Sequence, residues 1–330
     1  MRLEEALHRL DPEVDSAIIQ KKENIYYLTG FFPTAFAVLV LGDEPYLAVS
    51  EMDSLLAKDV DVQVRVVKDF KKELSFRGRV GIEKRHTTLD FAEKYLRGCE
   101  VVEIGFIDEM RQVKDRDEVR RIKEAIRITE HVLGSIEAEG ATEKELAAEI
   151  AFEINRAADL AFDPIVASGE NSAIPHHRPS GKNIKPSEPL IIDLGARLQH
   201  YNCDMTRTFA RNPSKRFREV YRAVVEAQEA GIKQLKPGTP VRECDAAVRG
   251  VFKEYGFEQY FLHSTGHGVG LEVHEAPRIS KESEDAFKEG MVVTVEPGVY
   301  IPGWGGVRIE DAVLVGKKPQ VLTGFPKMDP

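Results

Sequence analysis

Residues 189–210, PLIIDLGARLQHYNCDMTRTFA, decide the fold of the second half of this chain, because they read as two β-rich strands joined by a turn. The first strand ends at Asp193, and Asp204 lies in the second. An aspartate at the end of a buried strand is costly unless it is paired or binds a metal. Two carboxylates facing each other would repel, and a divalent cation would remove that repulsion. We therefore expect a metal site here.

A second stretch repeats the pattern. Residues 291–315, MVVTVEPGVYIPGWGGVRIEDAVLV, again read as two strands, which carry Glu296 and Glu310. Any one of these acids could be a turn residue or half of a salt bridge, but four in similar β-rich surroundings favour a shared site. The parallel between the two stretches hints at an internal two-fold arrangement.

The nitrogen ligand is expected from HSTGHGVGLEVHE, residues 263–275, where glycines let the backbone bend closely around a ligand. Alone, His267 would more often be a structural histidine, but five of the nine histidines fall in this stretch and in residues 176–177. Four carboxylates with one imidazole suit two divalent ions such as manganese or cobalt better than a thiolate-type zinc site. Two such ions can activate a water between them and polarise a carbonyl, which is the chemistry of hydrolysis.

The chain has two expected domains, residues 1–111 and 112–330. The first reads as a small α/β domain whose expected strands are 16–20, 35–41, 46–49, 62–67 and 80–83, with a helix over 88–96. The second opens with a long charged helix from Asp115 that ends before Gly140. Thr142 and Glu145 form a capping box for another helix, to about Ala158. Further helices are expected over 214–235 and after 239–240.

Composition excludes several classes of partner. The net charge is −9 and no long basic run is present, so we expect no nucleic-acid partner. No apolar run approaches the roughly 18 residues of a membrane helix, and the N-terminus lacks the apolar core of a signal peptide, so we expect no membrane partner. The three cysteines are far apart, which predicts neither disulfides nor a cysteine-based zinc site and favours a cytoplasmic location.

Four ordered motifs, IIDLGARLQHYNCDMTRT, HSTGHGVGLEVHE, VVTVEPGVY and GGVRIED, resemble the pita-bread metallopeptidases, and NIYYLTGF, residues 24–31, resembles the creatinase-type N-terminal domain. That family includes prolidase, aminopeptidase P, methionine aminopeptidase and creatinase. The resemblance covers essentially the whole chain. It implies an α+β fold of two domains, a small creatinase-like α/β domain followed by a pita-bread catalytic domain.

The resemblance also implies the metal ligands, which are Asp193, Asp204, His267, Glu296 and Glu310. Asp193 would be a terminal ligand of one ion, whereas Asp204 and Glu310 would bridge both. His267 and Glu296 would complete the shell of the second ion, and Glu296 would also shuttle the proton of the bridging water. The implied cofactor is two divalent ions per subunit, manganese or cobalt, with zinc as a further possibility.

Other residues are implied to handle the substrate. His176 matches the family's substrate-binding histidine, with His177 as the next choice. His274 would hydrogen-bond the substrate carbonyl or the developing oxyanion. His263 would line the pocket. We therefore expect Glu296, His274 and His176 to be catalytic.

Two arginines compete for the substrate's carboxylate. Arg308 lies two residues before Glu310, so on a strand both would point to one face, where the guanidinium could bind that carboxylate or support a metal ligand. Arg278 is the other candidate for binding the substrate's carboxylate. Either arginine could instead form a structural salt bridge. Tyr201 and Thr206 could orient Asp204 or be ordinary strand residues.

The activity implied by the resemblance is that of a Xaa-Pro dipeptidase, which cleaves small peptides containing proline. Its separate N-terminal domain distinguishes the chain from methionine aminopeptidase, and the complete ligand set distinguishes it from creatinase. Aminopeptidase P, which accepts longer peptides, is the alternative activity. A non-catalytic binding module is a third hypothesis, although such proteins lose ligands that are all present here. The resemblance further implies a homodimer.

Overall fold

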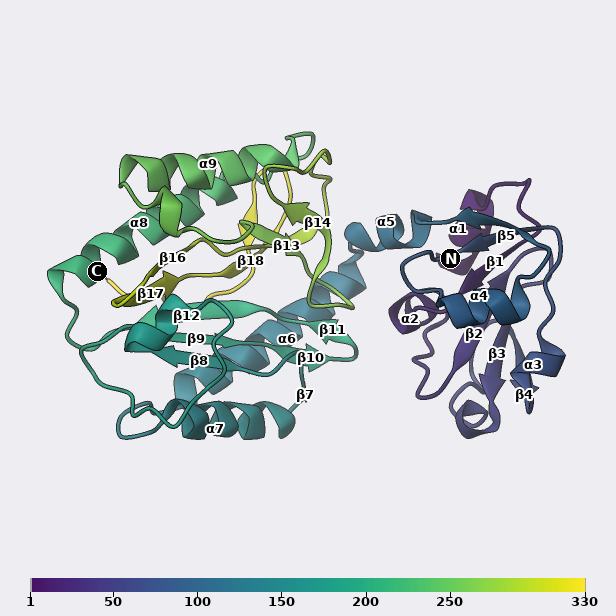
Figure 1. The fold of residues 1–330 in the computed structure, drawn as a ribbon, viewed down its shortest axis with the longest axis horizontal. Coiled ribbons are helices and arrows are strands. Elements are labelled where there is room, and N and C mark those ends of the chain that lie inside the picture. Colours follow the sequence, from purple (N-terminus) through teal and green to yellow (C-terminus); the bar gives the residue numbers. More distant parts are fainter. Residues whose placement is uncertain (1, 330) are drawn as a thin grey trace. The chain divides into compact units, whose positions relative to one another are not determined.

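The chain divides into two units, the first ending at Arg111 and the second beginning at Gln112 (Figure 1). The structure, a computed structural model, describes residues 2–329. Among these residues no helix is both long and apolar enough to cross a membrane.

The first unit is built on a six-stranded sheet in the order β4-β3-β2-β1-β5-β6. Its strands are β1 (Ser16–Ile19), β2 (Ala37–Leu41), β3 (Tyr46–Ser50), β4 (Gln63–Val67), β5 (Arg79–Ile82) and β6 (Glu100–Glu103). Its helices are α1 (Arg2–Arg9), α2 (Lys22–Thr29), α3 (Phe70–Glu73), α4 (Leu89–Tyr95) and α5 (Phe106–Gln112), the last of which ends one residue into the second unit. The strands β1, β2 and β3 pair antiparallel, whereas β4, β5 and β6 each join a neighbour in parallel. All five strands predicted for this unit are present, and α4 lies within the predicted helix.

Sequence reasoning missed β6 and the helices α1, α2, α3 and α5. The sequence of β6, EVVE, has only two apolar residues, and none of its residues is buried, so it gives almost no periodic signal. The helix α2 carries the family-like NIYYLTG segment, whose apolar residues lie on a weakly amphipathic helix that ends at Gly30. Gly30 has φ +75°, the left-handed conformation in which helices commonly end.

Side-chain caps open three of the four α-helices that begin among residues 113–329. The four helices are α6 (Arg116–Ser135), α7 (Glu143–Asn155), α8 (Lys215–Ile232) and α9 (Val241–Glu254). The fourth has Pro240 at its N-cap and no side-chain hydrogen bond there, so the cap expected at residues 239–240 is absent. Asp115 and Glu118 form a capping box at the start of α6, and the predicted box of Thr142 and Glu145 opens α7. The helix α7 ends at Asn155, three residues before the predicted Ala158.

The strands of the second unit lie between these helices, with α8 and α9 on one side and α6 and α7 on the other (Figure 1). They are β7 (Asp159–Leu160), β8 (Ile165–Ser168), β9 (Leu190–Leu194), β10 (Ala196–Leu198), β11 (Tyr201–Asn202), β12 (Met205–Phe209), β13 (Gly266–Gly268), β14 (Glu275–Ile279), β15 (Val292–Val295), β16 (Gly298–Ile301), β17 (Gly305–Arg308), β18 (Asp311–Leu314) and β19 (Gln320–Val321). The main sheets have the orders β12-β9-β8 and β14-β13-β15-β18-β19, and shorter pairings join β11-β10-β7 and β16-β17.

Each of the two predicted strand pairs contains a second pair of strands, a short hairpin, between its two outer strands in the sequence. In the first stretch β9 pairs antiparallel with β12, and the hairpin β10-β11 lies between them in sequence. In the second, β15 pairs with β18, and the hairpin β16-β17 lies between them. The four acids fall at or next to the ends of the outer strands. The expectation of one turn per pair was therefore too simple, because short hairpins replace the turns.

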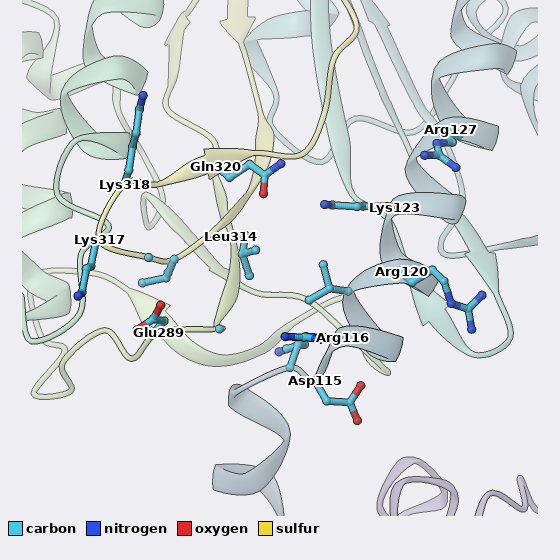
Figure 2. A pocket seen from close by; sticks show the side chains of 15 residues that line it. Asp115, Arg116, Arg120, Lys123, Arg127, Glu289, Leu314, Lys317, Lys318 and Gln320 are labelled. Carbon is cyan, nitrogen blue, oxygen red and sulfur yellow. The ribbon is translucent and has the colours of Figure 1, made fainter.

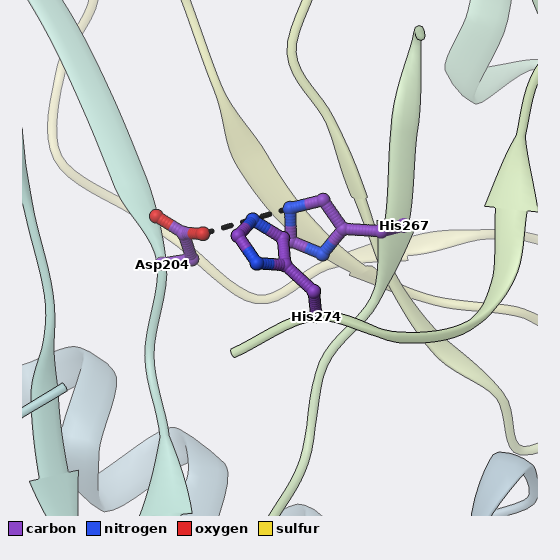
Figure 3. A group of neighbouring side chains, drawn as sticks. All are labelled: Asp204, His267 and His274. Atoms are coloured by element: carbon purple, nitrogen blue, oxygen red, sulfur yellow. Dashed lines mark ion pairs between the residues drawn. The ribbon is translucent and has the colours of Figure 1, made fainter. Parts of the chain in front are cut away.

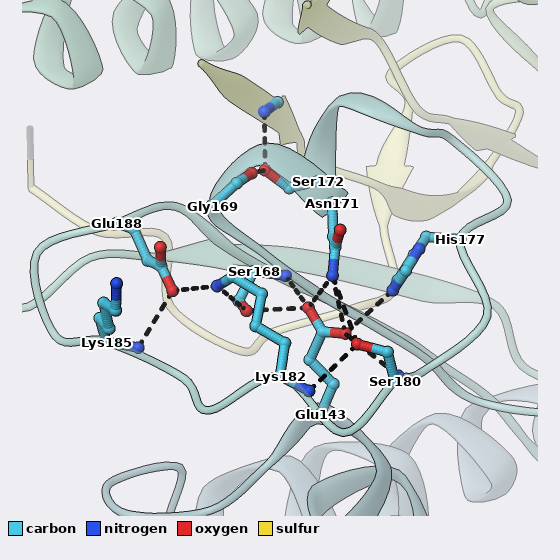
Figure 4. A network of polar contacts seen from close by, with 11 residues as sticks. Glu143, Ser168, Gly169, Asn171, Ser172, His177, Ser180, Lys182, Lys185 and Glu188 are labelled. Carbon is cyan, nitrogen blue, oxygen red and sulfur yellow. Dashed lines mark hydrogen bonds and ion pairs between the residues drawn. The ribbon is translucent and has the colours of Figure 1, made fainter. Parts of the chain in front are cut away.

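Glu143, the first residue of α7, fastens the segment that carries His176. Its carboxylate accepts hydrogen bonds from the backbone and hydroxyl of both Ser168 and Ser180, and from Asn171 (Figure 4). His177 Nε2 lies 2.9 Å from Glu143 Oε2. Burial alone would raise the pKa of Glu143, but these hydrogen bonds outweigh it and lower the pKa to about 2.

We predict that Glu143→Gln destabilises the protein by on the order of 3 kcal/mol at neutral pH. The pKa of Glu143 is lower in the folded protein than its ordinary value, so the ionised carboxylate stabilises the fold, and glutamine lacks that charge. That stability is present above about pH 4.5 and is lost as the pH falls towards 2. The free energies of unfolding of wild type and variant, measured against pH, should therefore converge in acid. Glu149→Gln, on the exposed face of α7, is the control. A difference that stays constant across this range would contradict the account.

Candidate metal centre

Five side chains far apart in sequence converge in the second unit. Three overlapping groups have ligand atoms within 4.8 Å of one another: Asp193, Asp204 and Glu310; His267, Glu296 and Glu310; and Asp204, His267 and His274. All five predicted ligands belong to at least one group, and Glu310 joins the first two. Figure 3 shows Asp204 and His267 facing each other with His274 beside them.

Strand pairing brings the acids together. Asp193, on β9, is opposite Thr206, two residues after Asp204. Glu296 directly follows β15 and Glu310 directly precedes β18, so these two acids flank the point where that ladder ends. His267 arrives on β13, which pairs with β15.

Two close backbone approaches make this convergence possible. A Cβ at Gly195 would lie 2.0 Å from the carbonyl oxygen of Cys203, and one at Gly266 would lie 2.0 Å from that of Thr294. No side chain fits at either position. Gly195, two residues after Asp193, and Gly266, directly before His267, are therefore required by packing.

A buried glutamine ties together the two strands that carry the glutamates. Gln228, on α8, donates through Nε2 to the carbonyl oxygen of Val295 at 3.0 Å and of Ile309 at 3.1 Å. These are the residues directly before Glu296 and Glu310. Lys327 contacts the other end of the amide, at Gln228 Oε1. Sequence analysis missed Gln228, because a single glutamine in an amphipathic helix carries no distinguishing pattern.

The cluster is strongly unfavourable for free carboxylates. Burial, followed by the charges of neighbouring acids, raises the pKa of Asp204 and of Glu310 well above the ordinary value. Burial also raises the pKa of Asp193, against the charge of Arg308. Asp193 Oδ1 and Glu310 Oε1 are buried and have no hydrogen-bond partner among the described residues. Oxygen-rich donors with unsatisfied atoms that face one another fit divalent cations, which would supply the missing charge.

Glu296 differs from the other acids because it lies beside His267, with 3.3 Å between Oε1 and Nε2. Burial alone would raise the pKa of Glu296, but the hydrogen bond and charge of His267 lower it to about 2. Burial alone would lower the pKa of His267, but the hydrogen bond and charge of Glu296 outweigh burial and raise it. His267 Nδ1 lies 3.0 Å from the carbonyl oxygen of Gly268, so Nε2 is the nitrogen directed at the cluster.

Arg308 supports a predicted metal ligand. Its Nη2 donates to Asp193 Oδ2 at 2.7 Å and its Nε to the hydroxyl of Thr206 at 3.1 Å. Its Nη1 donates to the hydroxyl of Tyr300 at 3.0 Å. Arg308 was expected either to bind the substrate's carboxylate or to support a metal ligand. The geometry favours the second role, because the guanidinium is almost fully buried and already hydrogen-bonded to Asp193, Thr206 and Tyr300.

The neighbours considered for Asp204 have other partners. The hydroxyl of Thr206 donates to Glu310 Oε2 at 2.8 Å, so it orients that acid. The hydroxyl of Tyr201 donates to Glu118 Oε1 at 2.9 Å, so this contact ties β11 to α6.

A cavity of about 680 Å³ opens beside the cluster. The four remaining predicted residues, His176, His263, His274 and Arg278, all line it, as does each of the five predicted ligands. His177 instead contacts Glu143, so of the two adjacent histidines His176 faces the cavity. Apolar wall residues that the sequence did not reveal are Phe162, Ile165, Pro175 and Val273.

The cavity histidines differ in how they are held. His263 Nε2 lies 2.8 Å from the hydroxyl of Tyr300, and its Nδ1 lies 2.8 Å from the carbonyl oxygen of Ser264. His274 is exposed, and its ring packs edge-on against His267 with 4.3 Å between centroids. Burial of its inner side, with the charge of His267, lowers the pKa of His274 and keeps the ring neutral. A neutral imidazole there can donate one hydrogen bond into the cavity.

Comparison with known proteins agrees with this architecture. The family model for metallopeptidase family M24 matches residues 120–317, and that for the creatinase/prolidase N-terminal domain matches residues 2–113. A Xaa-Pro dipeptidase of Pyrococcus horikoshii is 40% identical over 92% of this chain and 91% of its own length.

Solved structures give the same result. The prolidase from Pyrococcus furiosus has a TM-score of 0.90 and 37% identity, covering 95% of this chain and 97% of its own. An X-Pro aminopeptidase from Thermotoga maritima has a TM-score of 0.87 and 32% identity, covering 98% and 99%. The predicted two-part α+β fold is thereby confirmed. The chain belongs to metallopeptidase family M24 and carries the creatinase/prolidase type of N-terminal domain.

Proposed function

We propose that the protein is a Xaa-Pro dipeptidase that hydrolyses the bond before proline. The observation that carries the proposal is the convergence of four carboxylates and one histidine beside a cavity lined by three further histidines and two arginines. The Xaa-Pro dipeptidase and prolidase relatives support this substrate class.

In this proposal the ligands of two divalent ions are Asp193, Asp204, His267, Glu296 and Glu310. When bound, such a pair lowers the pKa of a water molecule and polarises the scissile carbonyl. The oxygen-rich donor set favours manganese or cobalt, with zinc as the further candidate. Arg308 holds Asp193 in place through a hydrogen bond to its Oδ2, and Thr206 holds one oxygen of Glu310.

The remaining side chains act on the substrate. Glu296 accepts the proton of the attacking water and passes it to the proline nitrogen that leaves. His274 donates a hydrogen bond to the oxygen that becomes negatively charged, with His176 on the same cavity as a second donor. His263, fixed by Tyr300, forms part of the wall.

Arg278 is the proposed partner of the substrate's carboxylate. It is exposed, lines the cavity, and has no carboxylate within ion-pair distance among residues 2–329. Arg308, its rival, is already paired with Asp193. A guanidinium that lacks a counter-ion is the better one to bind a carboxylate from outside.

Further proposals follow from the family. The homodimer implied by the resemblance is kept as part of this proposal, and so is the cytoplasmic location favoured by the sparse cysteines. Cys99, Cys203 and Cys244 are all free.

The substrate length separates this proposal from the main alternative, which the resemblance to an X-Pro aminopeptidase structure favours. We expect efficient cleavage of a Xaa-Pro dipeptide and much slower cleavage of a tripeptide with proline second. Rates on the two substrates, measured on the same metal-loaded preparation, decide the question. Cleavage of the tripeptide without cleavage of the dipeptide would assign aminopeptidase P activity. If the metal-loaded protein cleaved neither peptide, the binding-module hypothesis would be left.

Glu296→Gln should lower kcat by about 10²–10⁴-fold, because the amide cannot accept the proton of the attacking water. Metal content is measured on the same sample, since Glu296 is also a proposed ligand. Glu284→Gln, at an exposed position, is the control. A near-normal kcat with full metal occupancy would remove Glu296 from the proton-transfer role.

Arg278→Gln should raise KM for a Xaa-Pro dipeptide by about tenfold, because a charge-assisted hydrogen bond to the substrate is lost. The same substitution should hardly affect a dipeptide amide, which has no terminal carboxylate. Lys281→Gln serves as the matched charge control. Equal effects on the dipeptide and its amide would show that Arg278 does not bind the carboxylate.

A further inference from the structure

A second cavity of the Gln112–Pro330 unit, of about 760 Å³, shares no lining residue with the cavity beside the metal cluster. It lies between α6 and the segment from Leu314 to Gln320 (Figure 2). Seven of its fifteen lining residues are lysine or arginine and two are aspartate or glutamate. In a chain with a net charge of −9, this concentration of positive charge needs an explanation.

The charge comes mainly from one face of α6. Arg116, Arg120, Lys123 and Arg127 recur at intervals of three and four residues, which places them along one side of a helix, spread over about 16 Å. Figure 2 shows Arg116 and Lys123 reaching from α6 towards Leu314, whereas Arg120 points away.

The pairing of these residues distinguishes a built site from an ordinary solvated helix face. Arg120 pairs with Asp117 and Glu124 of its own helix, as exposed helical charges commonly do. Arg116, Lys123 and Arg127 have no carboxylate within 4 Å among residues 2–329, although Lys123 is partly buried. On the opposite wall, Lys317 and Lys318 are likewise without one.

The other charges of the cavity do not neutralise this group. Lys114 is already paired with Glu275 at 3.0 Å, and the carboxylate of Asp115 accepts hydrogen bonds from the start of α6. Glu289 is the remaining acid of the lining. Apart from the paired Lys114 and Arg120, five cations and the two acids Asp115 and Glu289 therefore surround an open volume of the size that holds a small molecule.

We propose that this cavity binds a small anion that carries a chain of phosphates. Guanidinium groups bind phosphate oxygens in pairs, and an ammonium between them adds a point charge. A ligand with several linked charges matches the length of the row better than a single phosphate. None of the fifteen described residues that line the cavity is aromatic, so the phosphates rather than a stacked base supply the binding energy. The neighbouring edge strand β19 has only two residues, too few to bind an extended acidic peptide by strand addition.

The test is a calorimetric titration of the metal-loaded enzyme with inorganic tripolyphosphate and, separately, with ATP. Excess magnesium keeps both from removing the catalytic metals, and retained peptidase activity verifies this. We expect saturable binding that weakens with added salt. Lys123→Gln/Arg127→Gln should weaken it by at least about tenfold, as expected for two lost charge-assisted contacts. The matched control, Lys215→Gln/Arg218→Gln on the exposed face of α8, should change it less than about twofold.

Similar affinities for the two probes would assign an inorganic phosphate chain, and tighter binding of ATP would assign a nucleotide. The proposal is overturned if neither probe binds saturably, or if the Lys123→Gln/Arg127→Gln variant binds both as well as wild type. It is also overturned if a glutamate-rich peptide binds as tightly as tripolyphosphate and is weakened equally by the same variant. None of these outcomes depends on the proposed peptidase specificity.

Discussion

The structure of the second unit depends on one electrostatic constraint, which is that four carboxylates share a single buried site. Burial and mutual repulsion raise the pKa of Asp193, Asp204 and Glu310, and two carboxylate oxygens have no hydrogen-bond partner. A fold would not keep such a cluster for stability alone, because each buried charge without a partner is costly. In our proposal divalent cations remove the conflict, and the same oxygens are their ligands. The metal centre and the unfavourable electrostatics are therefore one feature.

The surrounding fold holds the cluster rigid. Two nested strand pairs deliver two acids each, and the hydrogen bonds of Gln228 fix the strands that carry Glu296 and Glu310. Arg308 neutralises part of the charge from one side, while His267 does so from the other. Farther out, Glu143 secures the segment of His176. The geometry of the proposed ligands is thus set by contacts outside the proposed metal site, which is how metal sites are usually tuned.

Much of the fold and of the metal cluster could be predicted from the sequence, because the signals lie within short stretches of the chain. The apolar run that ends at Asp193 and the glycine-rich stretch around His267 are strong signals within a few residues, and the order of the motifs predicted the family and the two-part fold. What could not be predicted depends on contacts across the chain. The sequence could not show that Arg308 is occupied by Asp193, that Tyr201 contacts Glu118, or that Gln228 joins two strands. Nor did it reveal the basic face of α6, because residues three and four apart form no continuous charged run.

The most direct test of the central claim is anomalous diffraction from crystals of the manganese-loaded protein. The account predicts two anomalous peaks per subunit, both enclosed by Asp193, Asp204, His267, Glu296 and Glu310, with Glu310 in contact with both. Peaks elsewhere in the molecule, or none at this cluster when bound manganese is verified in the same crystals, would contradict it.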